Sequence, residues 1–262
     1  MQLDKRRLIR ASGLLALAAS LCLSLATTSW AAPIDHGNFT GDGVSFVAVS
    51  EDSITDPDTL PLFGVPTVSG DSLDFNGISF GSTPDGSGID ITNGNLTMGI
   101  EALGSGVIDS ISVLEAGDYT LFGVPGSVAL ASVSAAVYLD ILEVDGSGID
   151  PINVQANLVF SPTDGLFDLE TGGPALARIW NGELVIDVAQ ALADNGIEGG
   201  ASKVSLTLSN MLATANAPGA ASFINKTDLD ISVGVVPEPA TLALLGIGLL
   251  GLFLLGDRRR TG

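Results

Sequence analysis

Two short acidic loops contain the residues whose types and spacing could bind a metal ion. The hexapeptide Asp-Gly-Ser-Gly-Ile-Asp occurs at 85–90 and again at 145–150, and a glutamate stands shortly before the second copy. Ca²⁺ prefers six to eight oxygen ligands, which the carboxylate, hydroxyl and carbonyl groups of such loops supply. The candidate Ca²⁺ ligands are Asp85, Ser87, Asp90, Glu143, Asp145, Ser147 and Asp150.

The same loops also have a purely structural interpretation. Asp-Gly and Ser-Gly are among the dipeptides that tight turns favour, because glycine accepts a positive φ and Asp bonds its own backbone. The spacing of the acidic residues also differs from that of an EF-hand loop. The sequence leaves turn and Ca²⁺ site as alternatives, and it predicts no other cofactor.

Few other residues in the chain are suited to catalysis. His36 is the sole histidine and Cys22 the sole cysteine, so zinc centres built from several histidines or cysteines are excluded. Sugar-cleaving clefts commonly use aromatic platforms, and beyond residue 31 the chain has only Trp180, Tyr119 and Tyr138 besides phenylalanines. We therefore predict no catalytic residues and expect that the protein is not an enzyme.

Charge is distributed very unevenly along the 262 residues. The whole chain has a net charge of -20 and a positive mean hydropathy of +0.46. Residues 33–236 hold 27 acidic residues against three basic ones, a net charge of -24, whereas basic residues and long apolar runs gather at the two ends. Such acidity excludes a nucleic-acid-binding protein, which needs Lys and Arg to replace phosphate counterions.

The N-terminal 31 residues have the pattern of a secretory signal peptide. A basic segment at 5–10 precedes an apolar stretch, and Ser29-Trp30-Ala31 supplies small residues for signal peptidase cleavage after Ala31. The pattern predicts a signal helix at 1–31, export through the Sec translocon and cleavage by signal peptidase. A retained helical anchor is the alternative.

The C-terminal residues combine a proline motif, an apolar run and a basic end. Residues 240–256 are uncharged, and as a helix they would extend about 25 Å, just enough to cross a thin bilayer. The arginines that follow should remain in the cytoplasm, which places the body on the other side of the membrane. The residues that define this pattern are Pro237, Glu238, Pro239, Arg258, Arg259 and Arg260.

This ordered triple resembles a PEP-CTERM sorting signal, as found on exported proteins of Gram-negative bacteria that make exopolysaccharide and biofilm. The resemblance covers residues 236–262 and implies an exosortase as partner, which would remove or exchange the tail near 237–239. It also implies an inner-membrane precursor that is later released to the cell surface or the extracellular matrix. A simple tail anchor is the alternative.

The body at 32–235 alternates apolar and polar residues with a period of two. Clear examples are residues 44–49, 108–113, 203–208 and 228–233, and Gly, Pro, Asn and Asp separate the runs. The pattern predicts an all-β fold of nine to eleven strands, a β-sandwich of jelly-roll or immunoglobulin type. One helix is expected within 186–195.

An internal echo indicates a duplicated half-sandwich. Leu-Phe-Gly-Val-Pro occurs at 62–66 and 121–125, so its offset of 59 residues nearly equals the 60-residue offset of the acidic hexapeptides. For function, the acidic exported body together with the PEP-CTERM resemblance, which implies exopolysaccharide and biofilm, leads us to expect a structural or adhesive role in such a matrix. The alternative is a calcium-dependent carbohydrate-binding module, and a glycosidase is less favoured still.

Overall fold

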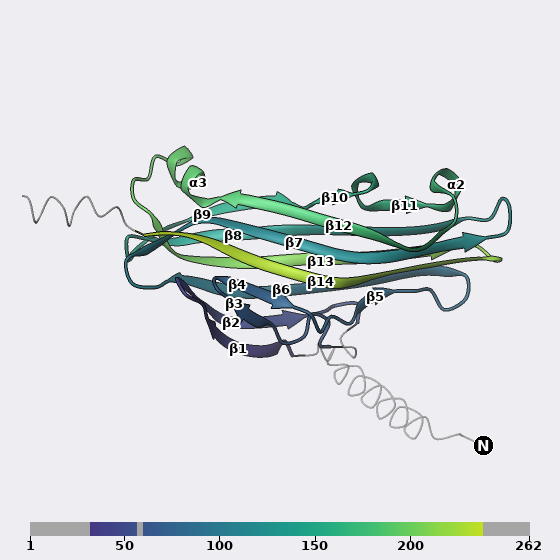
Figure 1. Cartoon of the computed structure of the whole chain (residues 1–262), viewed down its shortest axis with the longest axis horizontal. Coiled ribbons are helices and arrows are strands. Elements are labelled where there is room, and N and C mark those ends of the chain that lie inside the picture. Colours follow the sequence, from purple (N-terminus) through teal and green to yellow (C-terminus); the bar gives the residue numbers. More distant parts are fainter. Residues whose placement is uncertain (1–31, 57–59, 238–262) are drawn as a thin grey trace, which may run out of the picture. The chain divides into compact units, whose positions relative to one another are not determined.

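The computed structural model describes residues 32–56 and 60–237, and almost all of them lie in β-strands (Figure 1). The strands form two sheets whose inward side chains pack into one apolar core, which is the arrangement of a β-sandwich. The predicted all-β class is therefore confirmed. The predicted signal helix and the predicted membrane helix at 240–256 lie outside the described residues.

The first sheet has the order β1-β2-β6-β13-β8-β9, and β11 also pairs with β8. Each strand of this sheet is antiparallel to its neighbours. Antiparallel neighbours can be joined by short hairpin turns. Its strands are β1 (Ile34–Thr40), β2 (Val44–Asp52), β6 (Gly88–Ala102), β8 (Ala129–Val144), β9 (Ser147–Asn157), β11 (Leu166–Asp168) and β13 (Ala201–Asn216).

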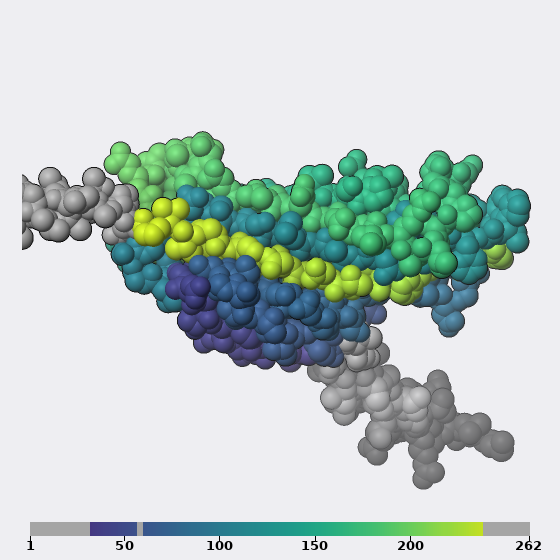
Figure 2. Space-filling model, in the orientation of Figure 1, coloured from purple at the N-terminus to yellow at the C-terminus, as the bar shows by residue number. Residues whose placement is uncertain are grey.

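The second sheet has β14 and β7 at its centre, with β12 and β10 on one side and β3, β4 and β5 on the other. In Figure 2, the yellow β14 runs between the blue N-terminal strands and the teal and green strands of β7 and β12. Its strands are β3 (Thr67–Ser69), β4 (Ser72–Phe75), β5 (Phe80–Ser82), β7 (Gly106–Gly123), β10 (Val159–Ser161), β12 (Ala175–Asp187) and β14 (Ala220–Pro237).

The two sheets join at one end through a single pairing, Ala201 of β13 with Ile108 of β7. Along the rest of their length they face each other and enclose the apolar side chains that alternate along every long strand. Trp180 is fully buried and lies over Gly117, where a side chain would collide with the indole ring. That glycine therefore provides the space for the largest core residue.

Three short helical segments complete the described part of the chain: η2 (Thr163–Gly165), α2 (Leu169–Gly172) and α3 (Val188–Asp194). The side chain of Asp187 accepts a hydrogen bond of 2.7 Å from the backbone N–H of Gln190, which caps the start of α3. The helix expected within 186–195 is thereby confirmed.

Two details of the predicted fold need correction. The described residues contain fourteen strands rather than nine to eleven, because β3, β5, β10 and β11 have three residues each and are too short to show alternation. The repeats also lie in different settings. Phe63 is buried in the connection between β2 and β3, whereas Phe122 is exposed near the end of β7. The fold does not contain two equivalent halves.

Candidate functional site

The two acidic hexapeptides lie at opposite ends of the first sheet. The 85–90 loop leads into β6 beside Asn216, whose amide donates to the Gly86 carbonyl oxygen at 2.9 Å. The 145–150 copy forms the two-residue turn between β8 and β9 and the first four residues of β9, near the other end of β13. Because the two copies are separated by the length of β13, each loop would have to bind a cation by itself.

Two of the candidate Ca²⁺ ligands, Asp90 and Asp145, accept hydrogen bonds from backbone N–H groups. Asp90 Oδ2 accepts from the N–H of Thr83 at 2.7 Å, and Asp145 Oδ1 accepts from the N–H of Gly200 at 2.9 Å. Asp145 and Gly146 both adopt positive φ, as a tight two-residue hairpin requires. Within 32–56 and 60–237, no three His, Cys, Asp or Glu side chains lie close enough to form a metal-binding group.

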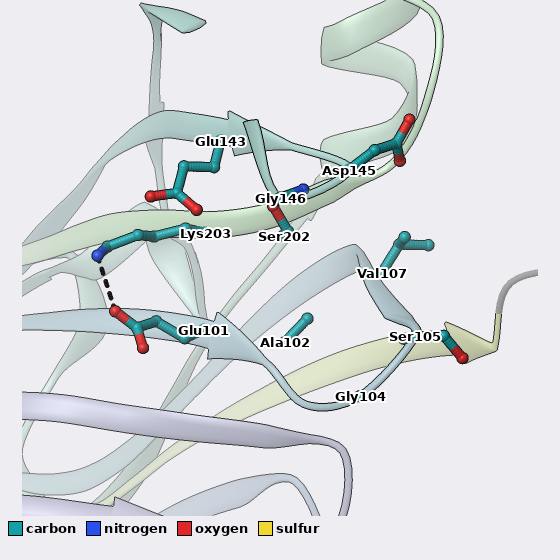
Figure 3. A pocket seen from close by; sticks show the side chains of 11 residues that line it. Glu101, Ala102, Gly104, Ser105, Val107, Glu143, Asp145, Gly146, Ser202 and Lys203 are labelled. Carbon is teal, nitrogen blue, oxygen red and sulfur yellow. Dashed lines mark hydrogen bonds and ion pairs between the residues drawn. The ribbon is translucent and has the colours of Figure 1, made fainter. Parts of the chain in front are cut away.

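A polar hollow of about 400 Å³ lies where the sheets join (Figure 3). Glu101 and Glu143 flank Lys203, and the Lys203 Nζ lies 2.8 Å from Glu101 Oε1. The hydrogen bond to Glu101 and its negative charge raise the pKa of Lys203, and the charge of Glu143 adds to this. The Asp145 carboxylate points away from this group. Lys203 therefore compensates only part of the negative charge of the hollow, which lies beside the end of β14.

From the hollow, a polar strip continues along the outer surface of the first sheet. Directly opposed residues of neighbouring antiparallel strands share one side of a sheet, so the register places Thr97, Thr207, Tyr138 and Gln155 in one row. The next row holds Gly99, Ser205, Asp140 and Asn153. We call the outward residues of these two rows the polar face.

Tyr138 is the aromatic residue of the polar face, and 45% of it is exposed to solvent. Beside it, the Asn153 amide donates to Asp140 Oδ1 at 2.6 Å, which fixes both side chains. An exposed ring among amides and hydroxyls is a surface on which a sugar can stack and form hydrogen bonds. None of these residues was among the predicted site residues. The alternation of apolar Val137 and Leu139 with Tyr138 and Asp140 indicates that Tyr138 and Asp140 point outward on the same side of the sheet.

His36 lies in β1, and its Nε2 is 2.9 Å from Oε1 of the buried Glu51. The other carboxylate oxygen of Glu51 accepts from the N–H groups of Leu62 and Phe63, at 2.9 and 2.7 Å. The sole histidine therefore has a structural partner and helps to hold the first Leu-Phe-Gly-Val-Pro segment.

Of the predicted sorting residues, only Pro237 belongs to the described part of the chain. It is exposed and is the last residue of β14, where it pairs with Gly106 of β7. Ala31, Glu238, Pro239, Arg258, Arg259 and Arg260 lie outside the described residues. In 32–56 and 60–237 no helix is both long and apolar enough to cross a bilayer.

Residues 235–260 match the family model described as the PEP-CTERM protein-sorting motif. The predicted resemblance is thus confirmed at this end of the chain. The motif indicates an exported protein that an exosortase system sorts to the cell envelope or surface. A search of curated proteins gave no match.

Solved structures with some similarity to the chain include TmCBM61 bound to β-1,4-galactotriose, with 9% identity, a TM-score of 0.23, and coverage of 70% of this chain and 82% of that one. The enzymatically active domain of bacteriophage CBA120 tailspike protein 4 has 10% identity, a TM-score of 0.19 and coverage of 76% and 19%. The Emp46p carbohydrate recognition domain has 13% identity, a TM-score of 0.22 and coverage of 58% and 81%.

Proposed function

We propose that the body is a non-catalytic surface protein with a structural or adhesive role in an exopolysaccharide matrix or biofilm. The observation that carries this proposal is the sorting motif at 235–260, which directly continues the last strand of the sandwich. In this proposal the Sec translocon exports the chain and signal peptidase cleaves after Ala31. The apolar run at 240–256 then holds the precursor in the inner membrane until exosortase acts.

Deletion of the exosortase in the producing bacterium tests the sorting step. The precursor should then accumulate in the membrane fraction with its tail intact. Replacing Arg258, Arg259 and Arg260 together by Gln should have the same effect, whereas Arg178→Gln in β12 is the control and should leave processing unchanged. Normal tail removal in the deletion strain would contradict the proposal.

The polar face favours a second candidate function, a carbohydrate-binding module. Tyr138 offers an exposed ring, and Gln155, Asn153 and Thr207 surround it with hydrogen-bonding groups on strands that fix their spacing. An extended polysaccharide presents alternating apolar ring faces and hydroxyl groups, which such a rigid surface can match without reorganisation. This function is compatible with adhesion, since a matrix protein must hold its polymer.

A glycan array probed with the full chain distinguishes general adhesion from specific sugar recognition. Specific recognition predicts binding to a defined polysaccharide that Tyr138→Ala lowers at least tenfold. Phe122→Ala is a matched control, because Phe122 is 57% exposed and lies on the other sheet. Equal binding by both variants would remove the polar face as the sugar site and leave the structural role.

Calcium dependence is the finer part of this second candidate. We propose the 145–150 turn as the better of the two loops, because Glu143 lies close by in the wall of the hollow. Titration calorimetry with Ca²⁺ should then give one binding event, which Asp150→Asn weakens. No heat of binding, together with an unchanged Tm in the presence of chelator, would overturn it.

A further inference from the structure

Three polar side chains from three different strands meet inside the apolar core. Lys226 of β14 and Glu115 of β7 come from the second sheet, and Asn210 of β13 comes from the first. The Lys226 Nζ lies 2.7 Å from Glu115 Oε1 and donates to Asn210 Oδ1 at 2.6 Å. The Lys226 and Glu115 side chains have no solvent exposure. We call these three residues the buried triad.

The surroundings of the triad are buried and aromatic. The rings of Phe63 and Phe80 each have their centroid 5.4 Å from Lys226 Nζ. Removing an ammonium group from water disfavours its charged form, so burial lowers the pKa of Lys226, although the charge and hydrogen bond of Glu115 oppose this. A lysine whose amine is neutral is a nucleophile, as in enzymes that use a desolvated lysine.

Apart from the Lys226–Glu115 ion pair, three polar atoms of the triad have no hydrogen-bond partner. They are the amide nitrogen Nδ2 of Asn210 and both carboxylate oxygens of Glu115, of which Oε1 is the one paired with Lys226 Nζ. An unsatisfied donor in a core costs free energy, and native cores seldom retain one without a reason. Loss of Asn210 Nδ2 as ammonia would remove this unsatisfied donor altogether.

The geometry also places the nucleophile next to its electrophile. Lys226 Nζ is 2.6 Å from Asn210 Oδ1, and a carbonyl bond is about 1.2 Å long, so the amide carbon lies within about 4 Å of Nζ. That is close to the separation from which bound groups react. Both residues are held by long strands within a packed core, so their approach does not depend on a chance encounter.

We propose that Lys226 and Asn210 form an intramolecular isopeptide bond, with Glu115 as the proton carrier. Within the ion pair a proton passes from the ammonium group to the Glu115 carboxylate. The neutral Nζ then attacks Asn210 Cγ and the Nζ–Cγ bond forms. Glu115 donates its proton to Nδ2 and takes one from Nζ, the Cγ–Nδ2 bond breaks and ammonia leaves. An amine and an amide thus become a substituted amide and ammonia, with no oxidant or further reactant.

Intact mass spectrometry of the purified full chain tests the proposal. The folded protein should be lighter than its sequence by one ammonia, about 17 Da. Asparagine followed by glycine also loses ammonia when it forms a succinimide, so the position must be mapped. Digestion and tandem mass spectrometry should recover one branched species that joins the peptide with Asn210 to the peptide with Lys226. Recovery of these two peptides only as separate, unmodified species would overturn the proposal.

Variants separate the chemistry from the fold. Lys226→Met, Asn210→Ala and Glu115→Gln should each abolish the branched species, and Glu115→Gln should do so while both reacting groups remain present. Lys203→Met is the matched control, because it removes an exposed lysine of the same ion-pair type, and it should retain the full loss of ammonia. A Glu115→Gln chain that folds and still forms the branched species would exclude Glu115 as the proton carrier. If that variant does not fold, the wild-type digest alone decides whether the bond exists.

Discussion

The sandwich contains two lysine–glutamate pairs that are almost identical in length and opposite in surroundings. Lys226 and Glu115 are 2.7 Å apart with both side chains fully buried, whereas Lys203 and Glu101 are 2.8 Å apart and 36% and 41% exposed. If the N–O distance alone set the strength of an ion pair, the two pairs would be equally strong. Their environments give them different energies, different pKa directions and, we propose, different chemistry.

The opposite pKa directions follow from one physical cause. At the exposed pair, water still solvates the ammonium group, so the partner carboxylate dominates and raises the pKa of Lys203. At the buried pair, loss of hydration outweighs the attraction of Glu115 and lowers the pKa of Lys226. A lysine becomes reactive when its charge is removed, so only the buried pair has the environment for bond formation.

The largest effect should come from removing one partner of the buried pair. In the Asn210→Ala background, where the isopeptide bond cannot form and Lys226 keeps its charge partner, Lys226→Met leaves Glu115 buried without that partner. Such losses cost about 3–5 kcal/mol of folding free energy. Denaturant unfolding of Asn210→Ala and of Asn210→Ala/Lys226→Met measures this. Adding Glu115→Leu should recover most of the loss, because apolar pairs of similar volume often match a buried ion pair. Equal stability of Asn210→Ala and Asn210→Ala/Lys226→Met would show that burial of the pair has no effect on its energy.

An intermediate effect should appear in the pH dependence of the two lysines. In Asn210→Ala, Lys226 keeps its amine, and the unfolded chain binds its proton more readily than the folded one. The contribution of Lys226 to stability should therefore rise with pH from its lowered folded pKa up to the ordinary value of 10.5. Comparison with Asn210→Ala/Lys226→Met, by unfolding at several alkaline pH values, isolates this contribution.

Lys203 should show the reverse sign. Its folded pKa lies above 10.5, so the stability that its pair supplies is fully present below that value and is lost as pH rises through the folded pKa. The difference between wild type and Lys203→Met, measured over the same pH range, checks the sign. A contribution that grew with pH would contradict the assignment of Glu101 as its dominant partner.

The smallest effect should be the loss of the exposed pair at neutral pH. Lys203→Met should lower the free energy of unfolding by only about 0.2–1 kcal/mol, as is usual for solvated ion pairs. The difference should shrink further at high salt, since counterions screen exposed charges. A cost equal to that of Lys226→Met would remove the contrast between the two pairs.

Much of the sandwich could be predicted from alternation alone. The run at 203–208 lies within β13 and the run at 228–233 within β14, because each buries every second side chain in the shared core. The short strands were missed because three residues do not establish a period. The repeated hexapeptides were overinterpreted as marks of a duplication, since a good turn sequence can recur wherever the chain reverses.

The buried triad was missed although the same alternation contains it. Glu115 follows Ile111 and Val113 on one face of its strand, and Asn210 lies between Leu208 and Leu212 on its own. Lys226 similarly comes two residues after the buried Ile224 in β14. Polar residues that occupy the apolar positions of an alternating strand are expected to face the core, where they can pair with one another. Their contact across the two sheets could not be derived, because it depends on the order of the strands.

The position of Pro237 has a mechanical consequence. In the proposed matrix role the chain is held at its C-terminal end, so any pull enters there and β14 transmits it along its pairing with β7. With the Lys226–Asn210 bond in place, tension passes from β14 into β13 at the centre of the sandwich. The intervening chain, residues 211–225, then carries no load, so hydrogen bonds along that stretch would survive forces that would unzip an unlinked sheet. A surface protein without a cysteine in its body would thereby have a covalent reinforcement that no reductant can break.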